Sequence, residues 1–222
     1  MRRIRGELRR AGSLLGILLL LGACTGEPSV SDVSAQLVEA IARSRAAGTV
    51  RTTTTMPAGV LPTTRITGAV DLTRGRSETF IEIHRGDGAV LPYGRVVRTA
   101  GAMFLGQYLG QGELVWQRSG GEAEEEDFAA PNFDGLLVLR ELERQAPRLR
   151  PDPDAEGRYR VVSRPETGGP TRRGLLVTSA RVGSDGRIAE VAVIIPSMAD
   201  AGAFRMAFAA YGEPVRITVP AV

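Results

Sequence analysis

The chain contains one cysteine, Cys24, and one histidine, His84, the two side chains best suited to nucleophilic or metal chemistry. A single thiol cannot form a disulfide within the chain, and the sequence lacks the paired cysteines of zinc sites. A catalytic cysteine needs a base beside it, and only His84 could serve. Cys24 follows the apolar run of residues 14–21, so its position is more informative than its reactivity.

His84 lies two residues after Glu82 and not far from Asp71, which raises the question of a base or a metal site. Alternate residues of a strand share a face, so Glu82 and His84 are predicted to lie together, opposite Ile81 and Ile83. We interpret that face as solvated. Spacing does not decide on a Ser-His-Asp site, because such triads are defined by geometry, but the sequence has no Gly-x-Ser-x-Gly elbow.

Two further motifs have ordinary interpretations. Glutamates at 122 and 124–126 with Asp127 could attract a cation, but their spacing does not match a calcium loop, and a solvated charge run is expected. Residues 85–87 spell Arg-Gly-Asp, which is also what a strand-ending turn uses.

Aromatic residues make up only 5% of the chain, which argues against surfaces that stack bases or sugars. We expect no enzyme activity, no metal and no cofactor.

The first 23 residues have the features of an export signal. The first ten hold five arginines against Glu7, and residues 14–21 are apolar except for Gly16. This run is shorter than the roughly 20 residues of a spanning helix. The four residues 21–24, Leu-Gly-Ala-Cys, resemble the bacterial lipobox, which predicts cleavage before Cys24 and lipidation of its thiol. The arginine pairs leave twin-arginine export open, and ordinary secretion is the default.

Cleavage at that point would anchor the exported chain, by lipidated Cys24, to the outer face of the cytoplasmic membrane. It would also remove the excess basic charge. The full chain has 28 basic and 25 acidic side chains. Residues 1–23 hold five of the former and one of the latter, so the remainder is near neutral. The chain therefore gives no reason to expect binding to nucleic acid.

The rest of the chain is predicted to form a tether, residues 24–31, and a single domain, residues 32–222. Ser31 can cap a helix that ends at Gly48, because apolar residues recur at the 3.6-residue period between them. β-Branched and alternating segments then predict strands, separated by turn residues, at 52–55, 66–72, 77–84, 94–99, 102–108 and 113–117.

A second helix is predicted at 133–145, and Pro147 ends it. Further strands are predicted at 158–163, 174–182, 187–195, 204–209 and 215–219, the last two from strict alternation of apolar and other residues. This order predicts an α+β fold with one large antiparallel sheet. Because strands twist against each other, a sheet of this size should curl into a half-barrel, with the helices covering its concave face.

Several features resemble the actinobacterial envelope lipoproteins of the LppX and LprG kind, which are related in fold to LolA-type lipoprotein carriers. They are the lipobox, the helix near Ser31 and the helix after the acidic run, together with three segments: MFLGQYLGQGELVW at 103–116, GSDGRIAEV at 183–191 and FAAYGEPVRITVP at 208–220. The resemblance implies a hydrophobic cavity for the acyl chains of lipids or lipoglycans. It also implies that the protein carries them within the envelope, with a transporter or another envelope protein as a possible partner.

Inward-facing apolar residues are the candidates for lining such a cavity, and ordinary core packing is the alternative for each. They are Val70, Leu72, Ile81, Ile83, Met103, Leu105, Leu136, Leu139, Val191, Val193, Phe204, Met206 and Phe208. Two hypotheses follow. The first is a membrane-anchored lipid binder, and the second is an envelope-anchored interaction or regulatory module whose groove is packed shut. An apolar cavity of several hundred Å³ would favour the first, and continuous packing the second.

Overall fold

The computed structural model describes residues 30–56, 64–109, 112–119, 134–161 and 175–221. Its first half consists of α1 (Val30–Ala46), β1 (Thr49–Thr55), β2 (Thr64–Asp71), β3 (Arg76–His84), β4 (Val90–Arg98), β5 (Met103–Leu109) and β6 (Glu113–Ser119). The second half consists of α2 (Gly135–Gln145), η2 (Ala146–Arg148), β7 (Leu149–Pro151), β8 (Arg158–Val161), β9 (Leu176–Val182), β10 (Ile188–Ile194), η3 (Pro196–Ala201) and β11 (Phe204–Ala209).

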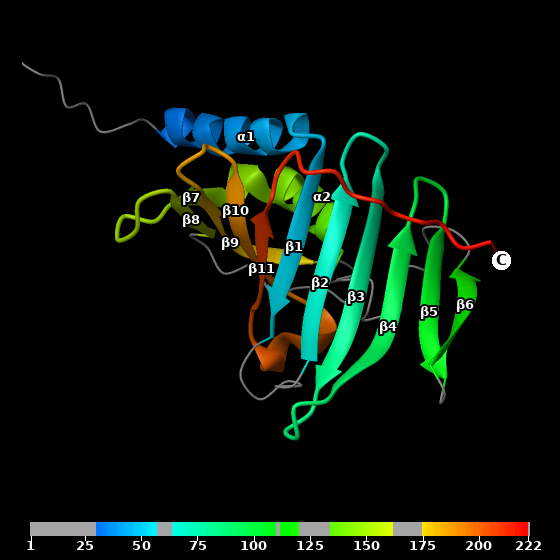
Figure 1. Cartoon of the computed structure of the whole chain (residues 1–222). Coiled ribbons are helices and arrows are strands. Elements are labelled where there is room, and N and C mark those ends of the chain that lie inside the picture. Colours follow the sequence, from blue (N-terminus) through cyan, green and yellow to red (C-terminus); the bar gives the residue numbers. More distant parts are fainter. Residues whose placement is uncertain (1–29, 57–63, 110–111, 120–133, 162–174, 222) are drawn as a thin grey trace, which may run out of the picture.

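All eleven strands form one open antiparallel sheet in the order β6-β5-β4-β3-β2-β1-β11-β10-β9-β8-β7. The chain reaches this order by two meanders, and β11 joins them by pairing with both β1 and β10. In Figure 1 the sheet curls, and α2 lies within the curl, where it packs against β2, β3, β9 and β10. The predicted fold class, a curved antiparallel half-barrel with helices on the concave face, is confirmed.

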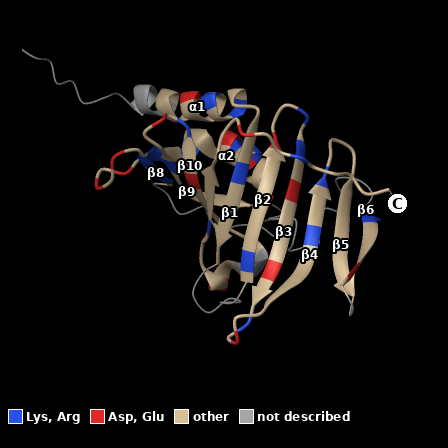
Figure 2. Ribbon diagram, in the orientation of Figure 1, with Lys and Arg blue, Asp and Glu red and all other residues tan. Residues whose placement is uncertain are grey.

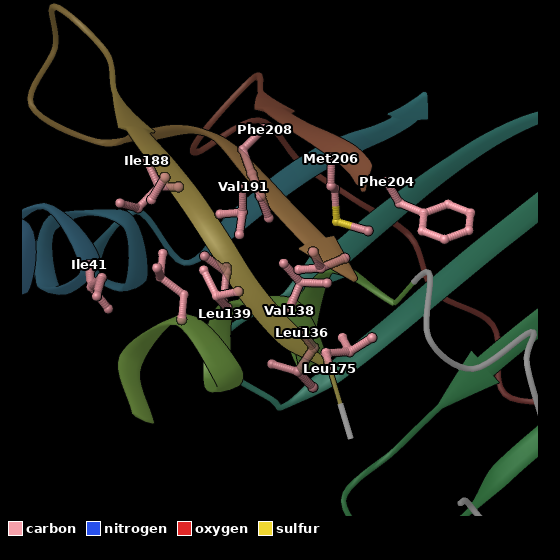
Figure 3. Close-up of a cluster of buried hydrophobic side chains, with 14 of the residues drawn as sticks. Ile41, Leu136, Val138, Leu139, Leu175, Ile188, Val191, Phe204, Met206 and Phe208 are labelled. Carbon is pink, nitrogen blue, oxygen red and sulfur yellow. The ribbon is translucent and has the colours of Figure 1, made fainter. Parts of the chain in front are cut away.

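The main core lies between α2 and the strands that it covers. The leucine and valine side chains on one side of α2 point into this core, and β10 and β11 supply the opposing side chains. Figure 3 shows this cluster, with Leu136, Val138 and Leu139 of α2 facing Val191 and the β11 side chains. Because α2 is strongly apolar on this side, it can bury that face only against the sheet.

Helix α1 is joined to the sheet by a buried hydroxyl. The Ser44 hydroxyl donates to the Ala40 carbonyl at 2.8 Å and accepts from the backbone N–H of Ile188 at 2.9 Å. The Ile188 carbonyl accepts in turn from the Tyr211 hydroxyl at 2.7 Å. One residue of β10 therefore connects the first helix to the chain that follows β11.

The predicted strand at 215–219 is wrong: residues 213–221 belong to no strand. β1 and β11 are already paired on both sides, so no edge of the sheet is free where this segment begins. Ala210 and Gly212 have positive φ, and the Gly212 N–H binds the Thr49 carbonyl, which turns the chain out of the sheet. In Figure 1 the segment runs across the ends of the strands instead of along them.

The sequence prediction also missed β7, which has only three residues and contains Pro151. The other strands and both helices lie where they were predicted, with ends that differ by a few residues. The acidic run at 122–127 and Cys24 lie outside the described residues. Among the helices of the described ranges, none has the length and apolarity needed to cross a membrane.

Candidate functional site

The structure divides the thirteen predicted cavity residues into two groups. Leu72, Ile83 and Leu105 are half-buried. The other ten are at most 9% exposed: Val70, Ile81, Met103, Leu136, Leu139, Val191, Val193, Phe204, Met206 and Phe208. Side chains with so little accessible surface offer almost no area to a ligand. In this structure these ten residues are therefore buried among neighbouring side chains, as in an ordinary core.

The N-terminus of α2 is fixed over the sheet by a buried ion pair. Asp134 precedes the helix, and its Oδ1 accepts from the Leu136 N–H at 2.8 Å as an N-cap. Its Oδ2 lies 2.5 Å from Nε of Arg98 on β4, and the two side chains are only 2% and 5% exposed. Arg98 also donates to the sulfur of Met103 at 3.6 Å. Two charged side chains that are buried this deeply are stable only when they pair with each other.

The C-terminus of α2 is fixed by a buried amide. Gln145 donates from Nε2 to the Leu175 carbonyl at 2.8 Å and accepts at Oε1 from the Val177 N–H at 3.1 Å. β8 pairs with β9 only further along, at residues 179–181, so Gln145 occupies the place of a missing strand neighbour. Helix α2 is thus held at both ends, and the core beneath it is closed.

Beyond α2, no helix of the described residues covers the concave face of the sheet. We define the open apolar patch as Ile83, Leu91, Leu105, Leu109 and Val115, from β3 to β6. Leu91, Leu109 and Val115 are 45%, 54% and 44% exposed, and Ile83 and Leu105 are half-buried. Of these strands, β4, β5 and β6 lie beyond β2 and β3, which α2 packs against.

The strand register places this patch on one face. Ile81, Gly94, Gln107 and Val115 form a row across β3–β6, because each pairs directly with the next. Ile83 lies two residues along β3 from Ile81 and therefore shares its face. Four neighbouring strands span about 14 Å, at about 4.8 Å per spacing. Gly94 leaves the middle of this surface without a side chain, and the exposed amide of Gln107 lies between the apolar groups.

The convex face of the same strands has a different character. The Arg95 guanidinium lies between two rings, 5.0 Å from the centre of Phe80 and 5.6 Å from that of Trp116. Its charge is neutralised by a short ion pair with Glu78, which is itself buried. Burial raises the pKa of Glu78, and the nearby Arg95 opposes that shift. On this face the two charged side chains form an ion pair, and the two aromatic rings contact the guanidinium.

Glu82 and His84 lie on one face of β3, as predicted, and are partly exposed there. Glu82 and His84 point the same way, with Nε2 and Oε2 3.8 Å apart and both side chains 40% exposed. Asp71 pairs with Arg76 at the other end of the β2–β3 hairpin and binds Arg74. The histidine and this aspartate are therefore not brought together. The described residues contain no group of three or more His, Cys, Asp or Glu side chains placed to hold a metal.

Sequence reasoning missed Leu91, Leu109 and Val115. Leu91 lies before the predicted start of its strand, and Leu109 lies after the predicted end of the next one. It also missed a groove of about 640 Å³ between α1, the β7–β8 loop and the β9–β10 turn. None of the predicted cavity residues lines that groove, whose lining residues come from α1, from the β7–β8 and β9–β10 connections and from the strand ends beside them.

Comparison with protein-family models gives no match, and neither does comparison with curated proteins. Among solved structures, the crystal structure of LprF from Mycobacterium bovis is similar to 89% of this chain and 100% of that chain, with a TM-score of 0.48 and 12% sequence identity. At 12% sequence identity and this TM-score, the similarity to LprF gives no information about a ligand of this chain. The chain is similar to LprF in its broad arrangement of helices and strands, and its fold class rests on the open sheet itself.

Proposed function

We propose that this protein is a membrane-anchored envelope lipoprotein that binds an acyl chain of a lipid or lipoglycan on the open apolar patch. The observation that carries the proposal is the exposure of Leu91, Leu109 and Val115 together on the concave face of β3–β6. Soluble proteins seldom leave aliphatic side chains grouped on a curved inner surface without a ligand or partner for them. Gln107 lies among them and supplies an amide for a polar group of the ligand.

The geometry sets the affinity that this surface can provide. Burial of a CH₂ group contributes about 0.8 kcal/mol, so ten CH₂ groups covered on one side would contribute about 4 kcal/mol. That corresponds to a Kd of about 1 mM. A micromolar Kd would therefore mean that the far side of the acyl chain is also covered in the complex.

The anchoring part of the proposal rests on the lipobox-like residues 21–24. Helix α1 begins at Val30, so about six residues separate its first turn from the lipidated Cys24. Fully extended, that tether spans about 20 Å. The domain would thus stay close to the membrane from which it takes or to which it delivers a lipid.

The test uses the purified protein with Cys24→Ala, examined by native mass spectrometry for bound lipid and titrated with a fluorescent fatty acid. We expect Val115→Glu and Leu109→Glu each to weaken binding about tenfold or more, because a carboxylate would then face the acyl chain. Val90→Glu is the matched control, since Val90 is 48% exposed but lies on the convex face with His84. Equal effects of all three changes, or a protein that binds no fatty acid, would refute the proposal.

A second candidate, the interaction module with a closed groove, is favoured by one observation. Ten of the predicted cavity residues are packed core, and α2 is fixed over them by Asp134 and Gln145. In that case the protein would carry no lipid after purification, and added lipids would leave its Tm unchanged.

A further inference from the structure

The groove beside α1 is separate from the open apolar patch and shares no residue with it. Four residues of α1 form one wall, the β7–β8 loop forms the second, and the turn between β9 and β10 forms the third. Its volume of about 640 Å³ is in the range of small-molecule sites, about 300–1,000 Å³.

The walls of this groove are held in place by internal hydrogen bonds. The Tyr159 hydroxyl donates to the Gln36 side chain at 3.3 Å, which joins β8 to α1. The Val182 N–H donates to the Gly157 carbonyl at 2.8 Å, which joins the loop to the end of β9. Gly186, at a φ of 72° that favours glycine, lets the turn approach the Arg43 guanidinium closely. The groove is therefore formed before any ligand arrives.

Side chains that can only accept hydrogen bonds and side chains that can only donate them line the same groove. The acceptors are the carboxylates of Glu39, Asp152 and Glu156, and the donors are the guanidinium groups of Arg43 and Arg158. Figure 2 shows both signs of charge on α1, acidic residues on the loop that leads to β8 and basic residues on β8. Arg43 pairs with Glu39 at 2.5 Å, and neither Glu156 nor Arg158 forms an ion pair with another described residue.

A ligand for such a groove must itself donate and accept. An anion would accept from the arginines but would meet three carboxylates, and a cation would meet two guanidinium groups. A hydroxyl group does both and carries no charge. Gln36 and Ser184, which also line the groove, have the same dual capacity. Apolar side chains between these groups, including Ala155 and Val182, suit the C–H faces of a carbohydrate ring.

We propose that the groove beside α1 binds a neutral, hydroxyl-rich group, one or two sugar units in size. Recognition would rest on hydrogen bonds, because the Tyr159 ring is buried and the groove lacks an open aromatic face among its described residues. The sugar could belong to a free glycan or to the headgroup of a glycolipid. This site goes beyond the proposed acyl-chain function and does not depend on it.

The test maps the amide NMR shifts of the ¹⁵N-labelled protein with Cys24→Ala. The soluble probes are neutral disaccharides of glucose, galactose and mannose, with glucose 6-phosphate and glucosamine as charged counterparts. We expect saturable shifts at residues 155–159 and 183–186 with at least one neutral disaccharide, and weaker shifts with both charged sugars. Vesicles of phosphatidylcholine with and without digalactosyl diacylglycerol test the membrane source: binding that needs the glycolipid, with no response to any free disaccharide, assigns the site to a headgroup.

Two variants identify the groups responsible. Glu156→Ala and Arg158→Ala should each weaken sugar binding about tenfold or more, because each removes charged hydrogen-bond partners. Glu113→Ala and Arg118→Ala make the same changes on β6 and should have no effect. The inference is overturned if neither sugars nor glycolipid vesicles shift the groove amides, if a charged sugar binds best, or if the groove and control variants behave alike.

The fatty-acid titration keeps this inference distinct from the proposed function. Groove variants that lose sugar binding should retain fatty-acid binding, and Val115→Glu should retain sugar binding. Loss of both activities in every variant would indicate misfolding, and the far-UV circular dichroism spectrum checks that directly. Well-folded groove variants with unchanged sugar affinity refute the site.

Discussion

Replacement of Asp134 should test how firmly α2 is attached to the sheet. This carboxylate both caps the helix and pairs with Arg98, and both side chains are at most 5% exposed. Removing one partner of a buried ion pair costs about 3–5 kcal/mol, and losing an N-cap costs about 1 kcal/mol. Asp134→Ala should therefore lower the free energy of unfolding by about 4–6 kcal/mol, a large part of the 5–15 kcal/mol typical of a domain.

Three further variants separate these two contributions. Asp134→Asn keeps an acceptor for the Leu136 N–H, so it should be about 1 kcal/mol less damaging than Asp134→Ala. Arg98→Met should cost about 3–5 kcal/mol by leaving the carboxylate unpaired. The double change of Arg98→Met with Asp134→Asn should cost clearly less than the sum of the two, because neither charge is then buried alone.

Urea unfolding followed by circular dichroism and by the fluorescence of Trp116, the only tryptophan, gives these free energies. Trp116 lies on β6, outside the α2 core, so the two probes also reveal whether the sheet unfolds as one unit. The reasoning is refuted if Asp134→Asn costs less than about 1 kcal/mol and the double variant is additive. The pair would then be solvated, and α2 could lift from the sheet readily.

Four other outcomes are expected. Burial raises the pKa of Tyr211 to about 12. The folded state then keeps a proton that the unfolded state loses near pH 10, so the free energy of unfolding should fall between pH 10 and 12. Tyr211→Phe should lessen that fall, as measured by urea unfolding. Glu78 also has a raised pKa, so the stability of the parent relative to Glu78→Gln should decrease as pH rises from the ordinary value of 4.5; an increase would contradict this sign. Gln145→Leu should cost about 2–4 kcal/mol in urea unfolding by leaving the Leu175 carbonyl and the Val177 N–H unpaired, whereas the exposed Arg144→Leu should change little. Cys24→Ala should move the protein from the membrane fraction to the soluble fraction, and unchanged fractionation would count against lipidation.

Much of the fold follows from local pattern. The switch from the 3.6-residue period before Gly48 to alternation after it, and back again near residue 133, marks both helices and most strands. The same rule failed at 215–219, because alternation describes the two faces of an extended chain but not whether a neighbouring strand has a free edge. That property depends on the order of all eleven strands.

The candidate site was harder to predict for a similar reason. Alternation identified both Val191 and Leu105 as inward-facing. Val191 is buried beneath α2 and Leu105 on β5 is only half-buried, and this difference depends on where the helix crosses the sheet. That position is set by contacts distant in sequence, including Arg98 with Asp134 and Gln145 with β9. The groove beside α1 leaves no motif, because its walls come from three separate segments.

The central claim is that acyl chains bind on the concave face of β3–β6, and cross-linking tests it most directly. A fatty acid with a photoreactive diazirine near its methyl end would be bound to the purified protein, irradiated and located by peptide mass spectrometry. The account predicts adducts on β5 and β6, around Leu105, Leu109 and Val115, that excess unlabelled fatty acid removes. Adducts confined to the convex face, or labelling that excess fatty acid does not reduce, would contradict it.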